Sequence, residues 1–161
     1  MSDKAKIGFI GLGLMGSAMV GRLLDKGYPM TVMANRSRAN VDAAVARGAA
    51  EVGTAREIAV ASDVVMLCMD TSASVEGRML GGDGVIAGLA PGMTVIDFGT
   101  SLPGSTKMLG EAVDAKGATL LDAPLGRTPA HAVDGRLNIM GAGDQAAFAA
   151  SKPVLDDLGE N

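Results

Sequence analysis

The chain has 161 residues, which is enough for one domain with its own hydrophobic core. Hydrophobic residues make up 48% of it but aromatic residues only 2%, so the core must be built from Ala, Val, Leu, Ile and Met. The net charge of −4 argues against a nucleic-acid partner or an anionic membrane surface. No apolar run approaches the ~20 residues of a membrane span, and the start of the chain shows no signal-peptide pattern, so we expect a cytoplasmic protein.

An apolar stretch over residues 6–10 predicts a strand that runs directly into the pattern Gly-x-Gly-x-x-Gly. Each glycine has a physical role: the first permits a tight turn, the second lets backbone approach a pyrophosphate, and the third lets a helix pack on the strand. Helical periodicity over 15–26 and an apolar run over 30–33 complete a strand–helix–strand unit. We therefore predict a dinucleotide site in which the pyrophosphate is held by Gly11, Leu12, Gly13, Leu14, Met15 and Gly16.

The remaining chain continues to alternate between strands and helices. Further strands are predicted over 49–52, 63–68, 94–98, 119–122 and 136–140, and further helices over 37–47, 54–59, 71–80, 103–116 and 144–158. Only residues 123–135, which contain prolines, are expected to form an irregular loop. The alternation predicts an α/β protein with a doubly wound, mainly parallel Rossmann sheet, helices on both faces, and ligands at the carboxyl ends of the strands.

The end of the second strand should choose between NAD and NADP. Asn35 lies there, 24 residues beyond the first glycine of the motif, where NAD enzymes usually place a carboxylate. A neutral side chain would not repel a 2′-phosphate, and Arg36, Ser37 and Arg38 could bind it. We therefore expect NADP as cofactor, with NAD as second choice; the alternative is an ordinary capped helix with two solvated arginines.

The sequence resembles the β-hydroxyacid dehydrogenases, a family that includes 3-hydroxyisobutyrate dehydrogenase, tartronate semialdehyde reductase and 6-phosphogluconate dehydrogenase. The similarity rests on the glycine motif over 11–19 and covers essentially the whole chain. The run over 95–103 is similar to the family's Ile-Asp-x-Ser-Thr-x-x-Pro, which implies that Thr100 lies beside the nicotinamide. The resemblance also implies that Met69, Asp70 and Thr71 belong to the loop that covers the ribose and pyrophosphate.

The substrate loop of that family usually reads Asp-x-Pro-Val-Ser-Gly-Gly, and here it departs from the pattern. Gly126 replaces the serine, and Arg127 and Thr128 replace the two glycines, a version similar to the sulfolactaldehyde reductase branch. The resemblance implies that Arg127 binds a sulfonate. The planar guanidinium group could equally bind a carboxylate or a phosphate. The alternative is a surface arginine. Asp122 is expected to be structural, either orienting this loop or capping Thr128.

Two reactive side chains are expected to have no catalytic role, and no metal site is expected. The only histidine, His131, falls where the family pattern places a variable helix residue. The only cysteine, Cys68, lies in an apolar run and has no neighbour that would lower its pKa, so we expect a buried hydrophobic residue.

The family's proton donor is a lysine on a long helix that follows this domain, and residues 1–161 end before that helix. The resemblance therefore implies that a C-terminal helical domain, which closes the cleft and builds the dimer, is absent. The full-length enzyme, a homodimer or homotetramer, would transfer hydride between NADP(H) and a small acidic hydroxy acid or semialdehyde, whereas 1–161 alone should bind cofactor without appreciable turnover. Two alternatives are a non-catalytic NADPH-binding module and an imine reductase or 6-phosphogluconate-type enzyme.

Overall fold

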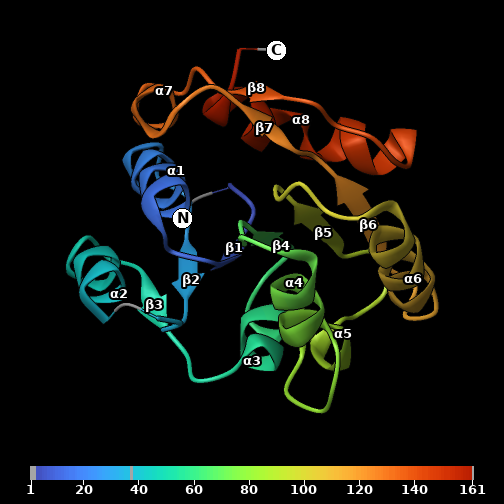
Figure 1. Ribbon diagram of the computed structural model, residues 1–161. Coiled ribbons are helices and arrows are strands. Elements are labelled where there is room, and N and C mark those ends of the chain that lie inside the picture. Colours follow the sequence, from blue (N-terminus) through green and yellow to red (C-terminus); the bar gives the residue numbers. More distant parts are fainter. Residues whose placement is uncertain (1–2, 37, 161) are drawn as a thin grey trace.

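The computed structural model describes residues 3–36 and 38–160. Within these ranges a six-stranded parallel sheet has the order β3-β2-β1-β4-β5-β6 (Figure 1). Its strands are β1 (Ile7–Ile10), β2 (Met30–Val32), β3 (Ala50–Glu51), β4 (Val64–Leu67), β5 (Thr94–Asp97) and β6 (Thr119–Asp122). The predicted doubly wound Rossmann fold is confirmed. The strand order reverses between β1 and β4, which places a crevice at their carboxyl ends.

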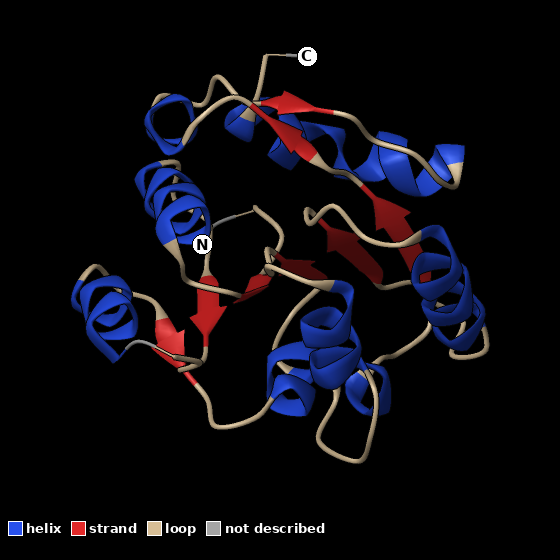
Figure 2. Cartoon of the chain, viewed as in Figure 1, coloured by secondary structure: helices blue, strands red, loops and turns tan. Residues whose placement is uncertain are grey.

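Helices cover both faces of this sheet (Figure 2). One hydrophobic cluster joins the sheet to α1 (Leu14–Asp25), α2 (Arg38–Ala46), α7 (Pro129–Val133) and α8 (Gln145–Leu158). The other cluster joins it to α3 (Ala55–Val60), α4 (Ser72–Met79), α5 (Val85–Gly88) and α6 (Pro103–Asp114). Strand β4 shows how one apolar run serves both: Met66 belongs to the first cluster, and Val65 and Leu67 belong to the second. Continuous apolar strands are typical of parallel sheets that are buried on both sides.

The predicted irregular loop over 123–135 is wrong. This segment contains β7 (Leu125–Gly126), which pairs antiparallel with β8 (Asn138–Ile139), and the five-residue helix α7. The second of its two prolines does not break a helix, because Pro129 occupies the first turn of α7, where a missing N–H has no consequence. The predicted strand over 136–140 is correspondingly shorter and belongs to this second, two-stranded sheet. Helix α5 was also not expected.

The end of α8 is tied to the loop between β7 and α7 through a carboxylate. Glu160 accepts hydrogen bonds from Nη1 of Arg127 and from Nε of Arg136, each at 2.6 Å. Its backbone N–H also donates to the carbonyl of Leu137 at 2.9 Å. The hydrogen bonds from Arg127, and then from Arg136, lower the pKa of Glu160 from its ordinary value to about 2.

We expect Glu160→Gln to lower the melting temperature slightly, because exposed ion pairs contribute little. Since the folded-state pKa is depressed, the contribution is present above the ordinary glutamate pKa and is lost as the pH falls toward about 2. The difference in melting temperature between wild type and variant should therefore shrink between about pH 6 and about pH 3. A difference that is constant with pH would contradict the ion-pair account.

A second prediction concerns the third glycine of the motif, Gly16, which lies in the first turn of α1. A Cβ there would lie 1.8 Å from the carbonyl oxygen of Gly11, so Gly16→Ala should force backbone apart and destabilise the fold by about 2–3 kcal/mol or more. Gly110→Ala is the matched control, because a Cβ at this helical position in α6 meets nothing within 4 Å. It should stabilise the fold by about 0.5–1 kcal/mol. Urea unfolding of both variants tests this; equal midpoints would contradict it.

Candidate functional site

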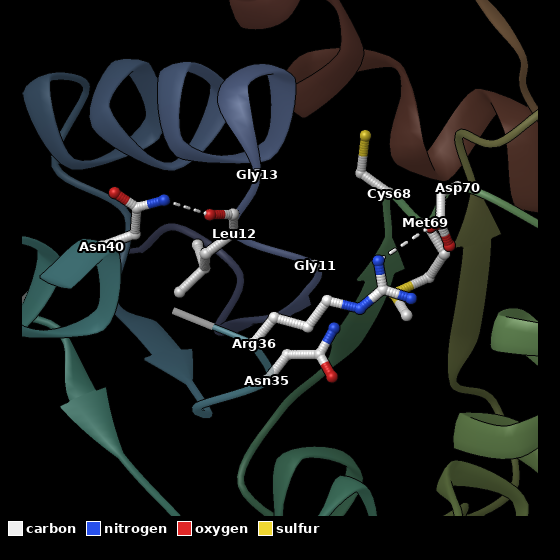
Figure 3. A pocket seen from close by; sticks show the side chains of 9 residues that line it. All are labelled: Gly11, Leu12, Gly13, Asn35, Arg36, Asn40, Cys68, Met69 and Asp70. Carbon is white, nitrogen blue, oxygen red and sulfur yellow. Dashed lines mark hydrogen bonds and ion pairs between the residues drawn. The ribbon is translucent and has the colours of Figure 1, made fainter. Parts of the chain in front are cut away.

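A pocket of about 200 Å³ lies at the point where the strand order reverses (Figure 3). Three separate segments of the chain meet there: the turn from β1 to α1, the segment after β2, and the segment after β4. The residues that line it are Gly11, Leu12, Gly13, Asn35, Arg36, Asn40, Cys68, Met69 and Asp70. Seven of the residues expected to bind pyrophosphate, 2′-phosphate and ribose, drawn from all three predicted stretches, therefore line one cavity.

The glycines of the turn have the geometry that their predicted roles require. Gly11 has a φ of +101°, and a Cβ there would lie 2.2 Å from the carbonyl oxygen of Cys68. Gly13 is different, because a Cβ at this position would meet nothing within 4 Å. The backbone at Gly13 is therefore open to the pocket, as the approach of a pyrophosphate needs.

The first turn of α1 offers backbone donors next to this opening. Gly13 is its N-cap and provides no side-chain cap, and the first hydrogen bond of the helix runs from the N–H of Ser17 to the carbonyl of Gly13 at 2.9 Å. The N–H groups of Leu14, Met15 and Gly16 therefore have no acceptor within the helix, and the positive end of the helix dipole lies beside them. Leu14 is 86% exposed, whereas Met15 packs against the core. This arrangement can bind an anion.

Asn40 of α2 also lines the pocket, and sequence patterns did not single it out. Its Nδ2 donates to the carbonyl of Leu12 at 2.6 Å, and the hydroxyl of Ser17 donates to the same oxygen at 3.0 Å. These two bonds hold the turn from both sides. No motif marks such an asparagine, because its partner is a backbone atom 28 residues away.

The residues expected to read the 2′-phosphate have different environments. Asn35 and Arg36 line the pocket, and Nη1 of Arg36 donates to Asp70 at 3.2 Å, one of the two dashed lines in Figure 3. Arg38 is not among the lining residues. Its Nη2 donates to Glu51 at 2.6 Å, and its Nε donates to Asp42 at 3.0 Å. The predicted contribution of Ser37 concerns a residue outside the described ranges.

The loop after β4 is held in place by its own hydrogen bonds. The hydroxyl of Ser74 donates to Asp70 at 2.8 Å, which lowers the pKa of Asp70, with Arg36 contributing further. Thr71 is the N-cap of α4, and its hydroxyl accepts from the N–H of Ser74 at 3.0 Å. Asp70 therefore stays charged near neutral pH and can compete with an incoming phosphate for Arg36.

Thr100, expected beside the nicotinamide, is exposed on the loop after β5. The buried carboxylate of Asp97 shapes this loop by accepting from the N–H of Gly99 at 2.9 Å and from the hydroxyl of Ser101 at 2.6 Å. Asp97 pairs in register with Asp122 on β6. Burial, and then the charge of Asp97, raise the pKa of Asp122, whose Oδ1 is buried without a hydrogen-bond partner in the part of the chain that the structure describes.

The three residues expected to bind the substrate anion lie apart from this pocket. Gly126 belongs to β7, and Arg127 follows it with a φ of +76°, donating to Glu160 and to the carbonyl of Arg136 at 2.7 Å. Thr128 hydrogen-bonds through Oγ1 to Nδ1 of His131 at 2.8 Å. The expectation that Asp122 caps Thr128 therefore does not match the structure, which gives that role to His131.

Cys68 lines the pocket but has the environment of a structural thiol. It is partly buried at the end of β4, and burial, followed by the charge of Asp97, raises its pKa to about 11. A thiol of this kind is protonated at neutral pH and is a poor nucleophile.

Across residues 3–36 and 38–160, no helix is long and apolar enough to cross a membrane.

Known proteins resemble this chain over nearly its whole length. It is 36% identical over 156 residues to the NAD-dependent L-serine dehydrogenase of Pseudomonas aeruginosa, covering 97% of this chain and 52% of that protein. It is 35% identical over 156 residues to the 2-hydroxy-3-oxopropionate reductase of Escherichia coli, covering 97% and 53%. The chain thus spans about half the length of the curated relatives it matches.

Solved structures agree on the fold. Psf3 in complex with NADP+ and 2-OPP has a TM-score of 0.89 at 30% identity, covering 95% of this chain and 54% of that one. Mycobacterium tuberculosis 3-hydroxyisobutyrate dehydrogenase with L-serine has a TM-score of 0.88 at 26% identity, covering 96% and 52%. An imine reductase from Pseudomonas sp. has a TM-score of 0.86 at 27% identity, covering 99% and 54%.

The match at family level includes the whole pocket. The model of the NAD binding domain of 6-phosphogluconate dehydrogenase matches residues 6–161, from the first strand through the glycine turn to the end of the chain. The glycine turn, the open N-terminus of α1 and the crevice between β1 and β4 are the features that such a domain needs to bind a dinucleotide. The chain therefore belongs to the NAD-binding domain family of 6-phosphogluconate dehydrogenase, together with hydroxy-acid dehydrogenases and reductases.

Proposed function

We propose that this chain binds NADP(H) and is the cofactor-binding half of an oxidoreductase that transfers hydride between NADP(H) and a small acidic hydroxy acid or semialdehyde. The observation that carries the proposal is the pocket between β1 and β4, with an open glycine backbone on one side and Asn35 and Arg36 on the other. The cofactor supplies the hydride chemistry when it is bound. The residues of this chain supply binding and orientation.

The preference for NADP is argued from charge at the end of β2. Asn35 places no negative charge where the ribose 2′ position lies, and Arg36 is its neighbour. The carboxylate that Arg36 contacts belongs to an exposed pair, with the two side chains 80% and 55% accessible. Such a pair is weak, so a phosphate can replace Asp70 at little cost. Arg38 would have to break its ion pairs with two carboxylates before it could bind the 2′-phosphate. We therefore assign the main role in binding this phosphate to Arg36.

The remaining site residues follow the same proposal. Thr100 would position the nicotinamide, and Gly126, Arg127 and Thr128 would bind the anionic group of the substrate. A guanidinium is suited to a carboxylate, sulfonate or phosphate, but Arg127 already binds Glu160, so a substrate anion would have to replace or join that carboxylate. Imine reductases share the fold, but a neutral imine would give Arg127 nothing to pair with.

Calorimetric titration of this chain with NADPH and with NADH tests the cofactor choice. We expect NADPH to bind more tightly, and we expect Arg36→Ala to weaken NADPH by about 10- to 100-fold, the range for a charge-assisted hydrogen bond, with little effect on NADH. Lys107→Ala, an exposed cation on α6, is the control and should change neither. Equal or tighter NADH binding would overturn the NADP preference, and absence of binding of either would overturn the proposal.

A variant of the second motif glycine separates binding from folding. Gly13→Ala is compatible with the local φ of −76° and places its methyl in open space, so the unfolding midpoint should stay close to that of wild type. The methyl should nevertheless block the pyrophosphate and weaken NADPH by about tenfold or more, corresponding to about 1.4 kcal/mol. Gly110→Ala again serves as control. Unchanged NADPH affinity in Gly13→Ala would place the pyrophosphate elsewhere.

A further inference from the structure

A second guanidinium reaches the end of β2 from a different element. Arg78 lies near the end of α4, and its Nη2 donates to the side-chain oxygen of Asn35 at 2.5 Å. The two residues are 43 positions apart in the sequence. Asn35 occupies the position whose side chain meets the ribose 2′ group in this fold, so the contact places Arg78 at the edge of the expected 2′ site.

The space around this contact is a second hollow that continues the cofactor pocket. It is lined by Asn35, Arg36, Met69, Ser74, Gly77 and Arg78. Three of these residues, Asn35, Arg36 and Met69, also line the first pocket, so the two hollows are adjacent. The lining contains two arginines and no carboxylate, which makes the hollow suited to an anion.

The distribution of ion pairs distinguishes Arg78 from the other arginines near this edge of the sheet. Arg38 is engaged by Glu51 and Asp42, and Arg36 contacts Asp70. In the ranges 3–36 and 38–160, Arg78 forms no ion pair, and its side-chain partner is a neutral amide oxygen. A partly buried guanidinium without a carboxylate gains more from an incoming anion than one that must exchange partners.

We propose that Arg78 is a specificity-determining residue that binds the 2′-phosphate of NADP(H) from α4, together with Arg36. The inference rests on the proposed function and adds to it a residue that the motif at the end of β2 does not contain. Asn35 holds the guanidinium in place before the cofactor arrives, so little side-chain entropy is lost on binding. A phosphate monoester has enough acceptor oxygens to engage both arginines at once.

Two fragments of the cofactor isolate the contribution of the phosphate. Adenosine 2′,5′-bisphosphate carries the 2′-phosphate and 5′-AMP lacks it, whereas the adenine and ribose are common to both. Calorimetric titrations of wild type, Arg78→Ala and Arg78→Gln with each ligand give the comparison. The glutamine variant keeps an amide that can donate to Asn35 but removes the charge, and Arg56→Ala, an exposed arginine on α3, is the matched control.

We expect both Arg78 variants to weaken adenosine 2′,5′-bisphosphate by about 10- to 100-fold and to change 5′-AMP by less than about twofold. Equal loss for both ligands would show that Arg78 only stacks on adenine or orders the loop, and would overturn the inference. Wild-type affinity for the bisphosphate in Arg78→Gln would overturn it as well. If wild type itself does not prefer the bisphosphate over 5′-AMP, both the NADP assignment and the inference fail. If wild type prefers the bisphosphate and the Arg78 variants keep that preference, only the inference fails.

Discussion

The backbone contact between the turn after β1 and the end of β4 is the constraint on which the site depends. The carbonyl of Cys68 lies where a side chain at Gly11 would have to be, and the carbonyl of Gly11 in turn lies where a side chain at Gly16 would be. Strand, turn and helix are therefore stacked at distances that only glycine allows. This stacking brings the N-terminus of α1 to the crevice between β1 and β4, and the loops after β2 and β4 complete the pocket around it.

The carboxylates beside the arginines near the pocket determine which of these arginines can bind the phosphate of a cofactor. The composition of the β2–α2 segment makes Arg36 and Arg38 look equivalent, but Arg38 faces Glu51 on the neighbouring strand and Asp42 one helical turn later. Arg36 faces a single exposed carboxylate, Asp70, and Arg78 faces the side-chain amide of Asn35. The identity of a cation is therefore not sufficient to predict an anion site. The partner that the fold places beside it determines how much free energy an incoming phosphate can gain.

The sequence was enough to predict those parts of the molecule that local patterns control. Apolar runs and glycine signals predicted all six parallel strands, including the exposed two-residue β3, and the motif at Gly11 predicted the pocket, because strand-to-helix turns are local. The segment over 123–135 failed because β7 contains a glycine and lies between two prolines, its pairing partner β8 lies outside the segment, and α7 has only five residues, too few to show a helical period. The contacts of Asn40 and Arg78 could not be predicted either, since each joins residues that are distant in sequence and neither has a motif.

The backbone at Arg127 is informative about the substrate loop. Its φ of +76° lies in the left-handed region, which costs an ordinary side chain about 1 kcal/mol and which glycine adopts freely. The pattern of the family that this sequence resembles has glycine at this position, so the chain combines a glycine-like backbone with a large cation. Such strain persists where surrounding contacts over-determine it, and here Glu160 and the carbonyl of Arg136 hold the guanidinium. A neutral glycine would fold this loop more easily. The arginine at this strained position therefore favours a role that needs its charge, and the proposed binding of a substrate anion is such a role.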